Sequence, residues 1–398
     1  MSHYQYLIIG GGMTADAAVG GIREIDPKGS IGLISQEPYR LYNRPPLSKA
    51  LWKGEPLDSI WRQTETRNVE MLLGRKAVRF DPKQRSVEDD LGVAHTYERL
   101  LLATGGKPRR FPFGGDHIIY FRTLDDYQRL RKMIQEGARR FAVIGGGFIG
   151  SEIAAALAMN KMEVVMIFPE AGIGARLFPP DLAEFLNKVY RDKGVELLVG
   201  ETITGLQAGD SQLVLKAQNL KTQQEREIVV NGIVAGLGIE PNVDLAVAAG
   251  LRVDNGIVVN EFLCTSDSNI YAAGDVANFH SPALGKRLRV EHEDNANTMG
   301  RAAGRAMAGD STPYHHLSLF YSDLFELGYE AVGELDSRLQ PVSDWKEPYR
   351  EGVVYYLEAG SVRGVLLWNV WGKVDAARDL IAKSGPFHPD DLKGRIAA

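Results

Sequence analysis

The chain has 398 residues, 44% of them hydrophobic, and a formal net charge of −5. This length allows two or three domains with a sizeable core, and the composition is ordinary for a globular protein. The negative charge and the scattered basic residues argue against a nucleic-acid-binding protein. No stretch reaches the roughly 18 apolar residues that a membrane span needs, so we expect no membrane span.

A single cysteine, Cys264, excludes an internal disulfide and a multi-cysteine metal site, so we expect no metal centre. The N-terminus enters an apolar strand without a charged leader. We therefore expect a cytoplasmic protein without a mitochondrial leader.

In chain order, residues 4–9 are predicted as a buried strand, a glycine loop follows, residues 15–23 continue as a helix, and residues 30–35 form a second strand. The same order restarts at Phe141, with a helix over 151–159 and a strand over 163–168. Alternating strands and helices favour a doubly wound parallel sheet. The sequence thus predicts an α/β protein with a repeat at domain scale.

From about residue 328 the pattern changes. Residues 329–335 and 351–370 are predicted as antiparallel strands, with a hairpin turn at Ala359-Gly360 and a helix over 374–383. This part is predicted as a separate C-terminal α+β domain.

Two glycine loops each stand between a predicted strand and a predicted helix. The first glycine permits a tight turn, the second lets a pyrophosphate approach the backbone, and the third small residue packs the helix on the strand. The helix N-terminus then faces the anion with unpaired N–H groups. The residues that fit the two patterns are Gly10, Gly12 and Ala15 in the first loop and Gly145, Gly147 and Gly150 in the second.

Polar residues at the end of each second strand are candidates for the adenosine ribose hydroxyls: Gln36 and Glu37 after the first loop, and Glu170 after the second. Like charges about 4 Å apart repel by about 4 kcal/mol at an effective dielectric of about 20. NADPH carries a phosphate on the 2′-oxygen of the adenosine ribose, and Glu170 would repel it. Glu170 therefore predicts a preference for NADH over NADPH. The alternative is that Glu170 is a solvated turn residue.

Asp275 follows Gly274 at the end of another apolar strand. A carboxylate in that place reaches a polyol hydroxyl such as a flavin ribitol, or it caps the next helix. The residues by themselves leave both interpretations open.

Several motifs together resemble the FAD- and NAD(P)-dependent pyridine nucleotide oxidoreductases. Besides the paired loops these are "LLATGG" (101–106), "GLGIEPN" (236–242) and "TSDSNIYAAGD" (265–275). Three further stretches are similar to apoptosis-inducing factor and the ferredoxin reductases of oxygenase systems: "YNRPPLSKALW" (42–52), "RVEHEDNA" (289–296) and "LFYSDLFELGYEAVGELD" (319–336). The C-terminal stretch "GVLLWNVWGKVDAARDLI" (364–381) is most similar to the apoptosis-inducing factor branch.

The resemblance implies two Rossmann-like domains, with the NAD domain (113–237) inserted in a discontinuous FAD domain (1–112 and 238–310), and a C-terminal α+β domain (311–398). It implies that the first loop binds FAD and the second NADH. Thr104 and Gly105 would join the FAD site together with Asp275, and Gly238 would join the NAD site.

The resemblance also implies roles in hydride transfer, which depends on positioning nicotinamide against flavin. Lys49 would lie beside flavin N5, Glu152 would meet the nicotinamide and pair with Lys49, Arg44 would contact FAD, and His292 would lie near both rings. Each role has an alternative. Lys49 could be a surface lysine on a helix beginning at Ser48, and Glu152 could be a first-turn carboxylate favoured by the helix dipole. His292 could be a structural histidine.

Two departures from the resembling proteins bear on function. Tyr321 stands where they have a tryptophan, and a tyrosine ring still stacks beside a flavin. Tyr42 and Asn43 stand where disulfide reductases and peroxidases carry cysteine, so no thiol takes electrons from the flavin. Glutathione, thioredoxin and coenzyme A disulfides are thereby excluded as direct substrates of the usual route.

The prediction is an FAD-containing NADH oxidoreductase that serves a ferredoxin- or rubredoxin-type carrier. One alternative is a redox-sensing flavoprotein like apoptosis-inducing factor, with a long-lived charge-transfer complex of reduced flavin and NAD and slow turnover. A weaker one is an NADH:quinone reductase. The oligomeric state stays open, with a C2 homodimer as the ordinary expectation.

Overall fold

The structure is a computed structural model that describes residues 2–209, 212–383 and 385–397. The chain forms two compact units, each assembled from three segments. The first unit contains Met1–Asn43, Asp58–Lys107 and Glu240–Phe320, and the second contains Arg44–Leu57, Pro108–Ile239 and Tyr321–Ala398. This division groups the C-terminal sheet with the second glycine loop, so the three predicted domain boundaries stay a prediction.

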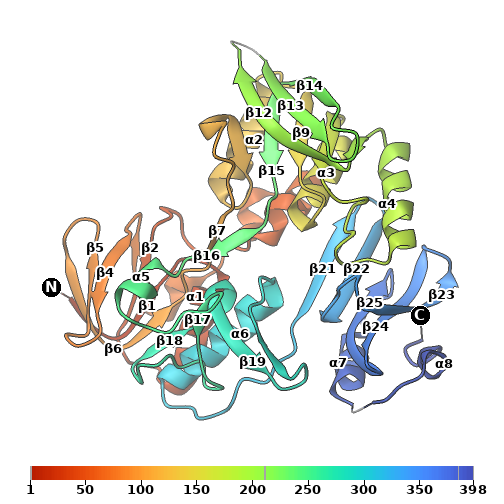
Figure 1. Cartoon of the computed structure of the whole chain (residues 1–398). Coiled ribbons are helices and arrows are strands. Elements are labelled where there is room, and N and C mark those ends of the chain that lie inside the picture. The colour runs from red at the N-terminus through yellow and green to blue at the C-terminus, as the bar shows by residue number, and fades with distance from the viewer. Residues whose placement is uncertain (1, 210–211, 384, 398) are drawn as a thin grey trace. The chain divides into compact units, whose positions relative to one another are not determined.

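The first unit is built on a sheet with the strand order β3-β2-β1-β6-β5-β4, to which β18 adds beside β6 (Figure 1). The part around β1 is parallel, and β4 and β5 extend it as an antiparallel hairpin. The strands are β1 (Ser2–Ile9), β2 (Ile31–Ser35), β3 (Glu70–Leu73), β4 (Ala77–Asp81), β5 (Ser86–Asp89), β6 (Ala94–Leu102) and β18 (Ile270–Ala272).

Two helices of this unit, α1 (Met13–Ile25) and α6 (Glu293–Met307), lie side by side (Figure 1). Glycine makes their close approach possible, because a Cβ at Gly300 or Gly304 would run into a backbone carbonyl oxygen of α1. The unit also contains the smaller elements α5 (Asp244–Ala248), β17 (Ile257–Val258), β19 (Ala277–Ser281) and β20 (Lys286–Leu288). The strands β7 (Gly106–Pro108) and β16 (Ile239–Pro241) lie at two of the places where the chain passes from one unit to the other.

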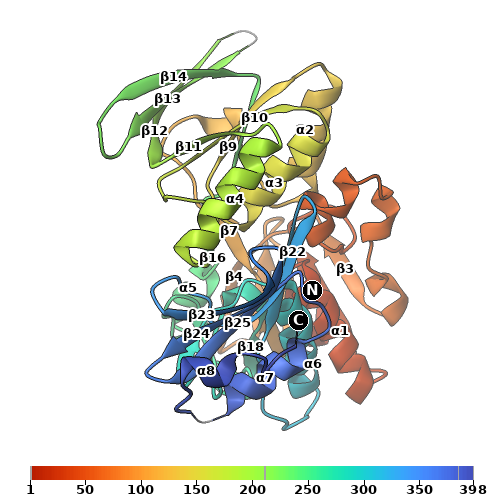
Figure 2. The same ribbon diagram turned by 90° about the vertical axis from the view of Figure 1, so that its right-hand side faces the viewer.

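The second unit repeats the strand, loop and helix order around a five-stranded parallel sheet, β11-β10-β9-β15-β8. Helix α3 lies beside β9 and β10 (Figure 2). The elements are β8 (Ile118–Tyr120), α2 (Leu124–Gln135), β9 (Arg140–Ile144), α3 (Phe148–Met159), β10 (Glu163–Phe168), α4 (Pro180–Asp192), β11 (Glu196–Val199) and β15 (Gly232–Ala235). The predicted domain-scale repeat and the α/β fold are thereby confirmed.

A three-stranded antiparallel sheet also belongs to this unit, formed by β12 (Glu201–Ala208), β13 (Leu213–Asn219) and β14 (Glu225–Val230). The C-terminal part forms a five-stranded sheet, β21-β22-β25-β24-β23, against which α7 packs (Figure 1). Its elements are β21 (Leu319–Leu324), β22 (Leu327–Gly333), β23 (Gln340–Glu347), β24 (Glu351–Glu358), β25 (Ser361–Trp368), α7 (Val374–Ala382) and α8 (Pro389–Leu392).

The hairpin between β24 and β25 turns where the sequence predicted it. Ala359 and Gly360 both have positive φ, 49° and 78°. Two positive φ angles in a two-residue loop twist the chain in the sense that the flanking strands require. The antiparallel strands predicted after residue 328 are present, and the predicted C-terminal helix begins at Val374.

Candidate functional site

The predicted site residues divide between the two units. The first unit holds Gly10, Gly12, Ala15, Gln36, Glu37, Thr104, Gly105, Asp275 and His292, and the second holds Arg44, Lys49, Gly145, Gly147, Gly150, Glu152, Glu170, Gly238 and Tyr321.

The first glycine loop joins β1 to α1, and each small residue meets a different constraint. Gly10 has a φ of +134°, and a Cβ there would run into the carbonyl oxygen of Ala103. Gly12 has an ordinary extended backbone, and a Cβ there would meet no described atom within 4 Å. Ala15 lies in the first turn of α1 and is fully buried. The tight turn thus requires Gly10 and the helix packing requires a small residue at Ala15, while the space beside the Gly12 backbone is open.

The second loop, between β9 and α3, has the same design. Gly145 has a φ of +108°, and its Cβ would run into the carbonyl oxygen of Gly236. A Cβ at Gly150 would run into the carbonyl oxygen of Gly145, whereas one at Gly147 would meet nothing among the described residues within 4 Å. In both loops the glycine whose Cβ would meet no described atom is also the residue preceding a helix of twelve or thirteen residues. Both loops therefore fit a dinucleotide pyrophosphate.

A buried carboxylate in the first turn of α1 would oppose an anion at this helix, but its charge is compensated. Asp16 accepts hydrogen bonds from Arg62 Nε at 2.6 Å and Thr64 Oγ1 at 2.6 Å, and it forms an ion pair with Arg67 at 3.2 Å. This cluster was not predicted from the sequence. The only signal was the acidic residue itself, because its partners lie 46 to 51 positions away.

The candidate ribose ligands of the first loop differ from each other. Gln36 is exposed, while the Glu37 carboxylate accepts a hydrogen bond from the Tyr42 hydroxyl at 2.5 Å. Tyr42 is buried, so this bond fixes the Glu37 side chain beside the end of β2.

Glu170, the ribose candidate of the second loop, is not a plain solvated residue. It forms an ion pair with Arg176, whose side chain is 80% exposed while that of Glu170 is 22% exposed. Arginine near the ribose accommodates the 2′-phosphate of NADP in some dinucleotide sites. In this pair, the Arg176 guanidinium would attract a 2′-phosphate and the neighbouring Glu170 carboxylate would repel it.

The "ATG" segment of the first unit is anchored to the loop that returns to it. Thr104 Oγ1 donates to the Asn242 carbonyl and Asn242 Nδ2 donates back to the Thr104 carbonyl, both at 2.8 Å. The Asn242 N–H donates to the Gly105 carbonyl at 2.9 Å. Thr104 and Gly105 are thus held by reciprocal hydrogen bonds.

Asp275 lies inside a short turn, Gly274–Val276, whose N-cap position is taken by Ala273. The helix-capping interpretation of Asp275 is therefore wrong. Its backbone carbonyl accepts a hydrogen bond from Arg289 Nη1 at 3.0 Å. Arg289 was also missed, and it belongs to the "RVEHEDNA" stretch.

Within the second unit, Lys49 and Glu152 form an ion pair, with Lys49 Nζ at 2.7 Å from Glu152 Oε1. The two side chains are only 12% and 3% exposed. Lys49 lies between two short 3₁₀ turns, Pro45–Ser48 and Ala50–Trp52, and Glu152 lies beyond the first turn of α3. The interpretations as a surface lysine on a helix and as a first-turn carboxylate are therefore wrong, and the ion pair implied by the resemblance is present.

Two fully buried tyrosines adjoin this carboxylate. Burial and, next, the Glu152 charge raise the pKa of Tyr190 and of Tyr329 well above the ordinary value of a tyrosine. Both phenols therefore stay protonated and neutral, and Tyr190 donates its hydrogen to the Ser151 carbonyl at 2.9 Å. The cationic partner of the Glu152 carboxylate is the Lys49 ammonium group.

The remaining candidates take distinct positions. The Tyr321 ring centroid lies 5.3 Å from Lys49 Nζ, a cation–π distance, so this tyrosine joins the Lys49 and Glu152 group. Arg44 Nη1 donates to the Arg122 carbonyl at 2.9 Å in the second unit. In the first unit, His292 is the N-cap of α6, and its ring stacks on Phe320 with centroids 4.4 Å apart.

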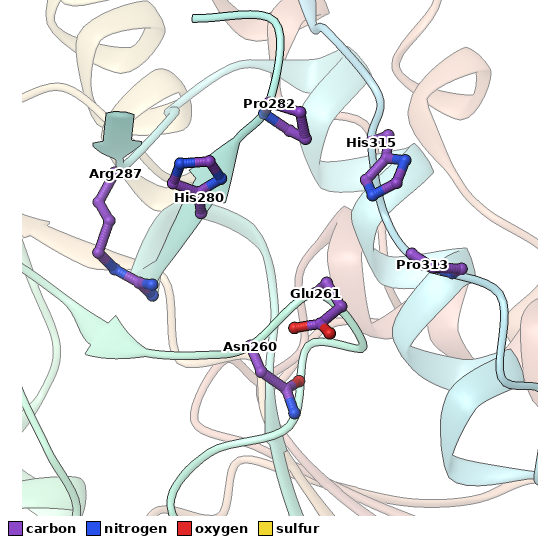
Figure 3. A pocket seen from close by; sticks show the side chains of 7 residues that line it. All are labelled: Asn260, Glu261, His280, Pro282, Arg287, Pro313 and His315. Carbon is purple, nitrogen blue, oxygen red and sulfur yellow. The ribbon is translucent and has the colours of Figure 1, made fainter. Parts of the chain in front are cut away.

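A hollow of about 360 Å³ lies in the first unit, and its lining includes none of the predicted site residues (Figure 3). Among the residues that the structure describes, no group of three or more His, Cys, Asp or Glu side chains is arranged to hold a metal ion. No helix in the described ranges is long and apolar enough to cross a membrane. The hollow is lined by Asn260, Glu261, His280, Pro282, Arg287, Pro313 and His315.

Two family models match the chain. The model described as pyridine nucleotide-disulphide oxidoreductase matches residues 4–300. The model described as the C-terminal domain of mitochondrion-associated apoptosis-inducing factor matches residues 303–348 and 340–383. Together they span both glycine loops, the Lys49 and Glu152 pair and the C-terminal sheet.

Individual proteins are similar over nearly the whole chain. Apoptosis-inducing factor 1, mitochondrial, of Dictyostelium discoideum is 33% identical over 96% of this chain and 79% of its own length. Putidaredoxin reductase of Pseudomonas putida is 30% identical, with 97% and 93% covered. The crystal structure of a covalent putidaredoxin reductase–putidaredoxin complex superposes with a TM-score of 0.89 at 29% identity, covering 98% of this chain and 95% of that chain. The crystal structure of a ferredoxin reductase from Rhodopseudomonas palustris superposes with a TM-score of 0.88 at 28% identity, covering 97% of this chain and 96% of that chain.

Proposed function

Because this chain belongs to the pyridine nucleotide-disulphide oxidoreductase family, we propose that it is an FAD-containing NADH oxidoreductase that passes electrons to a ferredoxin- or rubredoxin-type carrier. The family implies an oxidoreductase with a flavin and a nicotinamide nucleotide. The choice of FAD, of NADH and of the carrier is our proposal. It is supported by the paired glycine loops and by the likeness to putidaredoxin reductase.

The observation that carries the proposal is the buried Lys49 and Glu152 pair in the same unit as the second glycine loop. A bound flavin would accept a hydride from NADH and release electrons singly to a carrier. A lysine ammonium group held by a buried carboxylate provides electrostatic stabilisation where negative charge develops. Tyr321 gives that ammonium group an aromatic face.

The two nucleotides are assigned to the two loops as follows. In the first unit, the Gly10 to Ala15 loop would hold the FAD pyrophosphate, with Glu37 at the ribose and Asp275 at the ribitol. In the second unit, the Gly145 to Gly150 loop would hold NADH. The residues that would complete the sites are Gln36, Arg44, Thr104, Gly105 and His292 for the flavin side and Glu152, Glu170 and Gly238 for the nicotinamide side.

The chain has one cysteine, so the dithiol that disulfide reductases use is absent from the sequence. Electrons must therefore leave without a disulfide exchange step. A one-electron carrier that docks on the surface fits this requirement, and the relatives that are ferredoxin reductases support that class of partner. A cytoplasmic location and a homodimer stay predictions from the sequence.

A second candidate function is redox sensing with slow turnover. It is favoured by the match of residues 303–348 and 340–383 to the C-terminal domain of apoptosis-inducing factor, a region that includes Tyr321. In this function NADH would reduce the protein, and the reduced form would persist and alter its contacts with other proteins.

Stopped-flow absorbance separates the two functions. The protein is reduced anaerobically with one equivalent of NADH and mixed with air-saturated buffer, with and without an oxidised ferredoxin. Reoxidation by ferredoxin much faster than by air supports the reductase. Slow reoxidation by both oxidants supports the sensor, and no reduction by NADH contradicts both.

A further inference from the structure

Three donors from two distant segments meet on the buried Glu152 carboxylate. Ser48 Oγ donates to Oε2 at 2.6 Å, Ser322 Oγ donates to Oε1 at 2.7 Å, and Lys49 Nζ lies 2.7 Å from Oε1. Ser48 closes the first 3₁₀ turn, whereas Ser322 comes from β21 of the C-terminal sheet, 170 positions after Glu152. All four residues belong to the second unit.

Each serine hydroxyl fixes a different oxygen of the carboxylate. The terminal torsion of a glutamate side chain is broad, so a carboxylate with a donor on one oxygen alone is weakly oriented. Here Ser48 holds Oε2 and Ser322 holds Oε1, and rotation of the carboxylate would break both bonds. Both serines are buried, with exposures of 5% and 1%, so water does not readily replace either hydroxyl.

The carboxylate orientation in turn fixes Lys49. Its ammonium group contacts the same Oε1 that Ser322 holds, so Ser322 determines where that oxygen lies relative to the lysine. An ionised carboxylate is an acceptor only, which suits two hydroxyl donors and one ammonium donor. Without the hydroxyls, Lys49 would follow a carboxylate free to turn.

We propose that Ser48 and Ser322 are positioning residues that lock the Glu152 carboxylate and, through it, hold the Lys49 ammonium in place for hydride transfer. The role in hydride transfer rests on the proposed function, whereas the lock itself does not. Ser322 lies in the part of the chain matched by the apoptosis-inducing factor C-terminal model. The C-terminal sheet thus contributes directly to the geometry of the Lys49 and Glu152 pair.

The test uses the full-length, flavin-loaded protein with Ser48→Ala, Ser322→Ala and, as a matched control, Ser151→Ala. Ser151 is equally buried and adjoins Glu152 in α3, but its hydroxyl donates to the Phe148 carbonyl. Flavin content and melting temperature verify folding. If Ser322→Ala fails to fold, Ser48→Ala carries the test, because it lies outside the C-terminal sheet.

The first readout is the limiting rate of flavin reduction at saturating NADH. Losing one hydrogen bond to the charged carboxylate is expected to lower this rate about 10- to 100-fold in each serine variant, with little change in the NADH concentration for half-maximal rate. Ser322→Thr, which keeps the hydroxyl, should recover most of the rate. In a Glu152→Gln background the serine substitutions should add little, because residues that act as one unit are non-additive.

The second readout needs no turnover. Amine-reactive labelling followed by peptide mass spectrometry compares Lys49 with the exposed Lys188. We expect faster labelling of Lys49 in both serine variants and unchanged labelling in Ser151→Ala. Unchanged Lys49 labelling in both serine variants would overturn the lock. If labelling rises but NADH fails to reduce even the unsubstituted protein, the lock stands and the proposed function is wrong; if labelling rises and reduction is unchanged, the role in hydride transfer is wrong.

Discussion

Lys49 and Glu152 are joined by a contact of 2.7 Å, and both charges are largely withdrawn from water. A buried ion pair contributes little net stability, but removing one partner leaves the other charge uncompensated. The pair is therefore suited to holding the Lys49 ammonium charge in a fixed place. Replacing either partner should lower the stability of the protein.

Replacing Lys49 by alanine should leave the flavin bound and slow its reduction by NADH at least about tenfold, because the cation that stabilises developing negative charge is lost. The uncompensated Glu152 should also destabilise the protein by about 3 kcal/mol. Stopped-flow reduction and urea unfolding measure the two effects.

The matched control is Lys53→Ala, since Lys53 lies in the same segment but is 44% exposed and pairs with Asp323 on the surface. It should change neither quantity appreciably. Reduction kinetics in Lys49→Ala equal to those of Lys53→Ala would remove Lys49 from the mechanism.

The assignment of the two loops is tested by valine at their open glycines. A Cβ atom at Gly12 or Gly147 would meet no described protein atom within 4 Å, and both backbones are extended, so we expect the fold to tolerate each change. A bound pyrophosphate would meet the added side chain. Gly12→Val should therefore lower flavin content, while Gly147→Val should keep the flavin and raise KM for NADH about tenfold or more.

Flavin content comes from the absorbance ratio of the purified protein, and KM from steady-state reduction of an artificial acceptor. The two variants serve as controls for each other. Loss of flavin in Gly147→Val with full flavin in Gly12→Val would reverse the assignment.

The Glu170 and Arg176 pair makes a prediction about coenzyme choice. The protein should use NADH with a higher kcat/KM than NADPH, because the carboxylate repels a 2′-phosphate. Glu170→Gln should reduce the ratio of kcat/KM for NADH to kcat/KM for NADPH about tenfold. The substitution removes the repulsion and releases the Arg176 guanidinium to bind the 2′-phosphate.

The double variant Glu170→Gln with Arg176→Ala separates these two causes. If the arginine binds the phosphate, the gain for NADPH should largely disappear in the double variant. Comparable kcat/KM for both coenzymes in the unsubstituted protein would contradict the role given to Glu170.

The first unit should lose stability in acid through Asp89. Burial acts to raise the pKa of this carboxyl group, but hydrogen bonds from the Val93 and Leu91 backbones and from His95, with the Arg75 charge, outweigh it and lower the pKa. A lowered pKa in the folded state gives stability that is fully present above the ordinary value of about 3.8 and is lost as the pH falls through the folded value.

Asp89→Asn should therefore destabilise the protein by about 2–3 kcal/mol near pH 7 and flatten the decrease of stability below about pH 4. Urea titrations across that range measure both effects. Asp90→Asn, at the exposed neighbouring position, is the control. Parallel pH curves for the protein and Asp89→Asn would contradict this account.

Local patterns in the sequence predicted much of this protein. Strand, glycine loop and helix recur within short windows, so the α/β fold, the domain-scale repeat, the hairpin at Ala359-Gly360 and the family were all predicted and are confirmed. Each depends on residues that are close in the chain, where spacing and φ preference act directly. The roles of the glycine loops and of Glu170 came from the motif pattern, those of Lys49 and Glu152 came from the resemblance, and all of these roles stay predictions.

Apart from the Lys49 and Glu152 pair, which the resemblance implied, the tertiary structure decided which partners the charged residues have. Asp16 meets Arg62, Glu170 meets Arg176, and the serines that hold Glu152 come from positions 48 and 322. Except for Glu170 and Arg176, which are close in the chain, these partners come from separate segments, and a side chain's sequence neighbours carry no record of such a distant partner. The sequence therefore determined the loops that suit two nucleotides, and the packing determined how their charged residues are held.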